Sequence, residues 1–201
     1  MIFLFFIITV RREMKNKLFQ GILIGNFLFF LSGFVFSAPE IIKPCSLISQ
    51  QQAAEILGAE VNEPNGKPVT GMAPGHKCMY YTAGELEESG VIASLVIELY
   101  DAETLAEKGG SFETPEIFFN YQIKFSKQID MGVEEIEDLG EKAFWQDGMY
   151  QLNVLIPDYY ITLKIAGLKK FTGENKEEQK AEFLKAKSIE VMKTYILPKF
   201  Q

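Results

Sequence analysis

The sequence predicts an α+β fold in which helices pack on a mostly antiparallel sheet. Apolar and polar residues alternate along two neighbouring segments, 150–156 and 159–166, which is typical of a hairpin packed mainly on one side. Helical patterns precede and follow the strand-rich part, over 50–57 and 176–197. Strands grouped between helices indicate an α+β sandwich rather than alternating βα units. We expect a single domain, residues 38–201, long enough for one sizeable core.

The first 37 residues have the pattern of a secretory signal peptide. A short basic segment, 14–17, precedes an almost wholly apolar run, 18–36, and Ser37 ends a plausible cleavage site. We expect the biological start at Met14 and an exported mature protein, periplasmic or extracellular. The alternative is an uncleaved membrane anchor, because the apolar run approaches the length of a span. Membrane attachment is expected only in that case.

A short helix is predicted over residues 50–57. Ser49 and Gln52 match a capping box, and Gly58 supplies the C-terminal stop. Residues 62–76 are rich in Pro, Gly and Asn, so they are predicted to form a loop.

Two strands are predicted next, over 77–82 and 91–100. Every second residue from Val91 to Leu99 is apolar, which places one face of the later strand in the core. Because Ile92 and Val96 are apolar on the other face, we expect a central strand that is covered on both sides.

Two helices are predicted between the strand groups. The first covers about 101–108, and the second begins with Thr114 as N-cap and Pro115 at the first helical position. Residues 131–137 fit either a strand or a linker.

A three-strand meander and a final helix complete the domain. The first strand, 141–146, leads into Asp147-Gly148, a dipeptide typical of a two-residue type I′ turn. Pro157-Asp158 is expected to make the next turn. Asn175 is predicted to cap the final helix, 176–197.

The charge balance excludes one class of partner. The chain has 20 Lys and Arg against 27 Asp and Glu. Without residues 1–37, 16 basic and 26 acidic residues remain, a net charge near −10. Such a surface repels phosphate backbones and anionic lipids, so no nucleic-acid partner is expected.

Cys45 and Cys78 are the two cysteines of the chain. In an exported protein such a pair is most simply a disulfide. A redox pair usually lies closer in sequence, as in C-x-x-C. A zinc site needs three or four protein ligands, and His76, the one histidine, adds a single ligand to the cysteines. We expect a disulfide and no metal.

No catalytic set stands out in the sequence. A Ser–His or Cys–His arrangement would have to use His76, which lies in the predicted loop. Acidic runs such as 134–138 lack the spacing of a calcium loop, and no phosphate-binding glycine motif is present. A solvated acidic face explains these runs. We predict that the protein is not an enzyme and holds no cofactor.

Aromatic residues are the remaining signal. They are Phe118, Phe119, Tyr121, Trp145 and Tyr160. These side chains either form an apolar pocket or docking patch between helix and sheet, or pack in the core. Since neighbouring aromatic residues cannot all face one core, some aromatic surface is expected to be exposed.

Two short motifs suggest a family. Pro44-Cys45-Ser-Leu-Ile-Ser49 is followed by a helix ending at Gly58, then by Cys78 in a strand, and later by Leu139-Gly-Glu-Lys-Ala-Phe-Trp145. This arrangement resembles small exported domains related to the LpqN-type lipoproteins. The resemblance implies a PsbP-like fold, an α/β sandwich, with a Cys45–Cys78 bridge, and it implies no chemistry. The chain lacks the lipobox of the lipoprotein members.

Two functions therefore stay open. The first is a non-catalytic envelope module that binds a protein partner. The second is a carrier or sensor of a small apolar ligand, held between the helix near Phe118 and the sheet.

Overall fold

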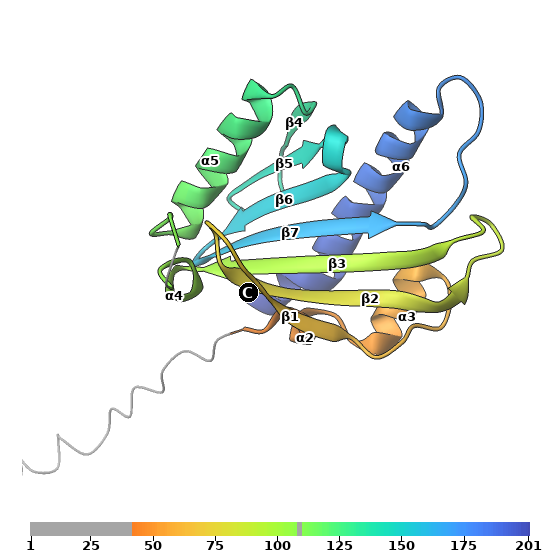
Figure 1. Cartoon of the computed structure of the whole chain (residues 1–201), viewed down its shortest axis with the longest axis horizontal. Helices are drawn as coiled ribbons and strands as arrows, with labels where there is room; N and C mark the ends of the chain where they lie inside the picture. Colours follow the sequence, from red (N-terminus) through yellow and green to blue (C-terminus); the bar gives the residue numbers. More distant parts are fainter. Residues whose placement is uncertain (1–41, 108–109) are drawn as a thin grey trace, which may run out of the picture. The chain divides into compact units, whose positions relative to one another are not determined.

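The computed structural model describes residues 42–107 and 110–201, and the predicted signal peptide lies outside them. The described residues form a seven-stranded sheet packed with helices (Figure 1), so the predicted α+β class is confirmed. All neighbouring strands run antiparallel, in the order β1-β2-β3-β7-β6-β5-β4. The strands are β1 (Asn65–Val69), β2 (Gly75–Glu85), β3 (Ile92–Asp101), β4 (Val133–Ile136), β5 (Lys142–Gln146), β6 (Gln151–Ile156) and β7 (Tyr159–Ala166).

Helices cover both faces of the sheet. They are α2 (Pro44–Leu47), α3 (Gln50–Leu57), α4 (Ala102–Leu105), α5 (Pro115–Gln128) and α6 (Lys176–Val191). The last helix continues as a π-helical turn, η2 (Met192–Ile196), and a 3₁₀ turn, η3 (Leu197–Phe200). In Figure 1, α6 passes behind β7 and β3, and α3 lies behind β2.

The two faces carry separate cores. The first face packs against α2, α3 and α6, and its strands contribute mainly aliphatic side chains, among them Leu95, Ile97, Leu152, Val154, Ile161, Leu163 and Trp145. The second face packs against α4 and α5 through a smaller, mostly aromatic cluster of Tyr100, Leu105, Phe118, Phe119, Phe144, Leu155 and Tyr160. Because strand side chains alternate between faces, one sheet serves both cores.

The first-face core is tied to the N-terminal helices by covalent and polar links. The predicted capping box is confirmed, since Ser49 accepts a bond from the Gln52 amide and Gln52 accepts one from the Ser49 amide. The predicted disulfide is also confirmed, and it joins Cys45 in α2 to Cys78 in β2 with their Cα atoms 5.1 Å apart.

The predicted loop over 62–76 was wrong. Residues Asn65–Val69 form β1, and β2 already begins at Gly75, so His76 lies in a strand. The misleading residue is Pro68, which lacks an N–H group. An edge strand tolerates proline because only one of its sides pairs with a neighbour.

Two predicted local structures at later positions were also wrong. A 3₁₀ turn over Asp147–Met149, followed by Tyr150 at φ 47°, replaces the two-residue type I′ turn. Asn175 makes no side-chain capping bond at the start of α6. Residues 131–137, left open between strand and linker, contain the strand β4.

The expected burial of two strands also differs from the structure. Both faces of β6 are buried, whereas the meander was expected to pack mainly on one side. Conversely, β3 was expected to be covered on both faces, yet Ile92 is exposed and Val96 only half-buried. Both differences have one cause: α5 contacts β6 and β7 and leaves the second face of β2 and β3 open.

Candidate binding site between α5 and the sheet

The second face has a polar centre, which the strand register places directly. Residues opposite each other in antiparallel strands share a face. One row across the sheet runs Lys77, Glu98, Thr162, Asn153, Phe144. The next row runs Met79, Val96, Lys164, Gln151, Gln146. Polar side chains therefore occupy the middle of β3, β7 and β6 on the face that α5 covers in part.

Aromatic packing fixes α5 over one half of this face. Phe118 packs edge-on against Tyr160 with their ring centroids 5.1 Å apart, and Phe119 packs edge-on against Phe144 at 5.2 Å. Near the other end of α5, the Gln146 side chain donates a hydrogen bond to the Ser126 hydroxyl at 2.8 Å. The helix is thus held along its length, by rings at one end and by a buried polar bond at the other.

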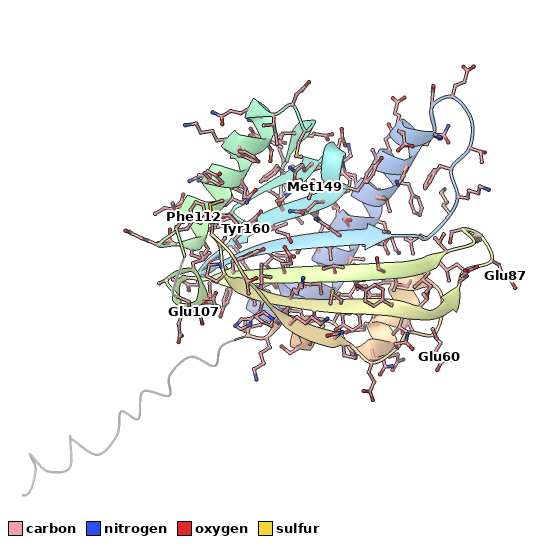
Figure 2. The ribbon with its side chains drawn as sticks, viewed as in Figure 1. Glu60, Glu87, Glu107, Phe112, Met149 and Tyr160 are labelled. Atoms are coloured by element: carbon pink, nitrogen blue, oxygen red, sulfur yellow. A yellow bond between two sulfur atoms is a disulfide. The ribbon has the colours of Figure 1, made fainter. Side chains whose placement is uncertain are left out.

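A cavity of about 230 Å³ lies where α5 meets the open part of the sheet. Its polar lining comes mostly from the strands: Glu98, Gln146, Gln151, Thr162 and Lys164, with Gln122 of α5. Its apolar lining is Tyr100, Phe118, Phe125, Met131, Met149 and Tyr160. Figure 2 labels Tyr160, beside the N-terminal end of α5, and Met149, at the turn after β5. The cavity joins a polar floor to an apolar wall.

Hydrogen bonds order the floor of this cavity. Asn153, almost fully buried, accepts bonds from the Tyr160 hydroxyl at 2.7 Å and from the Gln151 side chain at 2.6 Å. Its own amide nitrogen bonds to the carbonyl of Gln151 at 3.3 Å. Since a buried polar group without a partner costs free energy, this network fixes the three side chains together.

Glu98 is the acidic group of the cavity. One carboxylate oxygen, Oε2, accepts bonds from the Tyr100 hydroxyl at 2.8 Å and from the Thr162 hydroxyl at 3.2 Å. Burial raises the pKa of Tyr100 far above its usual range, and the Glu98 charge and hydrogen bond raise it further. Burial also raises the pKa of Tyr160 well above normal, again with a contribution from Glu98. Both tyrosines therefore remain neutral donors at physiological pH.

Glu98 and Lys164 both line the cavity without forming an ion pair with each other. Four ion pairs occur among the described residues, and none of them includes Glu98 or Lys164. The site thus presents one carboxylate and one ammonium group within a single small cavity. Both charges are available to a ligand.

Gly75 is required for the position of Tyr100. A Cβ atom at Gly75 would lie 2.8 Å from the Leu99 carbonyl oxygen and 2.8 Å from Cε1 of the Tyr100 ring. Only glycine allows this approach, because backbone and a packed ring cannot both move away. The end of β2 therefore supports the aromatic wall of the cavity.

The five aromatic residues singled out in the sequence do not form one patch. Phe118, Phe119 and Tyr160 pack together in the second-face cluster. Trp145 is buried in the first-face core, on the opposite side of the sheet. Tyr121 lies on the exposed side of α5, against Phe112 and Phe125. Exposed aromatic surface was expected, and Tyr121 and Phe125 provide it.

The polar floor was not singled out in the sequence. Thr162 and Lys164 were assigned to the more polar side of a hairpin, which usually faces water. A possible signal was Asn153, an amide in the middle of an otherwise apolar strand, where polar residues need a specific partner. Glu98, alone among the apolar residues of β3, gave a similar signal.

Comparison of the chain with protein-family models, curated proteins and solved structures found no match. The resemblance to LpqN-type domains therefore stays a prediction. Within residues 42–107 and 110–201, no helix is long and apolar enough to cross a membrane. In the same part of the chain, no three His, Cys, Asp or Glu side chains are grouped so that they could hold a metal ion.

Proposed function

We propose that this protein is a non-catalytic binding protein for a small amphipathic molecule, held in the cavity between α5 and the sheet. The observation that supports it most is the ordered polar floor beside an apolar wall. Ligand sites combine apolar lining with a few placed polar groups in this way. A ligand with an apolar body would contact Phe118 and Phe125, and its head group would reach Glu98 and Lys164.

The cavity suggests the size and charge of the ligand. Its volume, about 230 Å³, lies below the roughly 300–1,000 Å³ of sites for drug-sized ligands. One carboxylate and one unpaired ammonium group suit a head group that carries both charges. An aromatic or long aliphatic amino acid has this size and these charges. The sequence predicted a purely apolar ligand, and the polar floor is the reason for changing that proposal.

We also propose that the protein acts after export, in the periplasm or outside the cell. The Cys45–Cys78 disulfide is compatible with an oxidising compartment. The predicted signal peptide is the other support for this proposal.

Three related probes test the proposed ligand. Phenylalanine carries both charges, phenethylamine only the ammonium group, and phenylpropionate only the carboxylate. In NMR titrations we expect phenylalanine to bind at least about tenfold more tightly than the other two, because only it can satisfy both Glu98 and Lys164. The backbone amides of α5, β6 and β7 should shift.

Matched variants locate the site. Glu98→Gln and Lys164→Gln should each weaken phenylalanine binding to the level of the singly charged probes. Lys170→Gln, a similar change outside the cavity lining, should leave binding unchanged. Equal binding of all three probes would refute the charge assignment. No binding, together with no small molecule on protein taken from its source and measured by native mass spectrometry, would refute the ligand proposal.

A second candidate function is docking of a protein partner, the first expectation from the sequence. The observation that favours it is the exposed apolar side of α5, where Tyr121 stacks on Phe125 in contact with solvent. Exposed apolar surface of this kind often marks an interaction site.

A further inference from the structure

α5 carries a stripe of large apolar side chains on its solvent side. We call Ile117, Tyr121, Phe125 and Ile129 the α5 stripe, and each of them is between 39% and 47% exposed. Their four-residue spacing places them on one side of the helix. The buried side chains of the helix, Phe118, Phe119 and Ser126, lie toward the sheet instead. The stripe is therefore not part of the core that holds α5 in place.

The rings in the stripe are already packed against one another. Tyr121 and Phe125 lie nearly parallel, with their centroids 5.9 Å apart, and Phe112 packs on Tyr121 at 5.0 Å. Side chains that are ordered before binding lose less conformational entropy on docking. This arrangement favours association through the stripe.

The charges beside the stripe suit a second copy of the same helix. Glu113 precedes the N-terminal end of α5, and Lys124 lies on the same flank near the other end. Neither residue takes part in an ion pair among the described residues, whereas Glu116 and Lys127 are paired with Lys142 and Glu135. An antiparallel copy would bring each Lys124 near the other Glu113. A two-fold axis makes this contact twice.

We propose that the α5 stripe docks on the stripe of a second copy of this chain, with the two helices antiparallel about a two-fold axis near Tyr121. The proposal names a partner for the second candidate function. It does not depend on the ligand cavity, because Ile117, Tyr121 and Ile129 do not line that cavity.

The dimer is expected to be weak. The helix has 14 residues and is about 21 Å long, so a pair of such helices buries less than the roughly 1,200 Å² of a stable interface. The protein should therefore be in a concentration-dependent equilibrium between monomer and dimer.

Sedimentation velocity on protein expressed from the full-length chain tests the proposal. We expect wild type to shift from monomer to dimer as the concentration rises toward about 1 mM. Tyr121→Glu should raise the dissociation constant at least about tenfold, because it places a charge at the centre of the interface. Tyr81→Glu is a matched control, since Tyr81 has the same exposed fraction, 39%, and lies on β2. It should leave the equilibrium unchanged.

A charge exchange tests the antiparallel arrangement. Lys124→Glu and Glu113→Lys should each weaken the dimer, and the double variant should recover it, because the exchanged charges meet again across the axis. Monomers at every concentration would refute self-association. A dimer that Tyr81→Glu disrupts and Tyr121→Glu does not would refute the surface. A monomer that binds a different protein through Tyr121 would refute the second copy and leave the docking function standing.

Discussion

The two faces of the sheet share the same strands but differ in what they bury. The first face is filled by aliphatic side chains and Trp145 under α2, α3 and α6. The second face buries Asn153 and Thr162 among aromatic rings, and α5 covers only part of it. A dry face contributes stability through its area, whereas a polar face contributes a defined arrangement of donors and acceptors. The difference indicates that the first face holds the fold together and the second face supports binding.

Neighbouring residues of β7 test this difference most directly. Leu163 is fully buried on the first face, so Leu163→Ala should lower the free energy of unfolding by about 2–5 kcal/mol. Lys164 is half-buried on the second face, and Lys164→Ala should change it by less than about 0.5 kcal/mol. Urea unfolding measures both values. Equal losses would mean that the two faces contribute alike.

The buried network of the second face gives an intermediate effect. Asn153→Leu removes the acceptor of the Tyr160 hydroxyl and the Gln151 amide. Leaving these donors unpaired should lower the free energy of unfolding by about 1–3 kcal/mol. Val154→Ala, the neighbouring first-face position, serves as a comparison that loses only apolar contacts. A stabilised Asn153→Leu variant would show that the network has no structural cost when it is lost.

Tyrosine titration should distinguish the faces with the smallest effect. Burial alone raises the pKa of Tyr80, on the first face, to about 12, while Glu98 adds to the effect of burial on Tyr100 and Tyr160. These raised pKa values favour folding below about pH 10, and that stability is lost as the pH rises through the folded values.

Glu98→Gln should therefore lower the pKa of Tyr100 and Tyr160 and leave that of Tyr80 unchanged. The tyrosinate absorbance at alkaline pH, followed together with circular dichroism, measures this. Glu88→Gln, in the exposed turn before β3, is the control. A shift at Tyr80 as large as at Tyr100 would show that the faces are not electrically separate.

The sequence was informative where structure depends on neighbouring residues. The capping box at Ser49 and the start of α5 at Thr114 are local signals, and both were predicted correctly. Strand β1 was missed because Pro68 and Gly66 resemble loop residues, and their pairing partner lies in β2. The polar floor was missed for a similar reason. No local pattern shows that α5 folds over Asn153 and Thr162.

The two outer strands of the sheet have a consequence for how copies of this protein can associate. An unpaired strand edge is a template for adding another strand, which is the usual start of aggregation. At one edge, Pro68 interrupts the donors of β1. At the other, β4 has only four residues, two of them Glu134 and Glu135. Both edges therefore discourage intermolecular β-pairing, and ordered self-association is left to the helices.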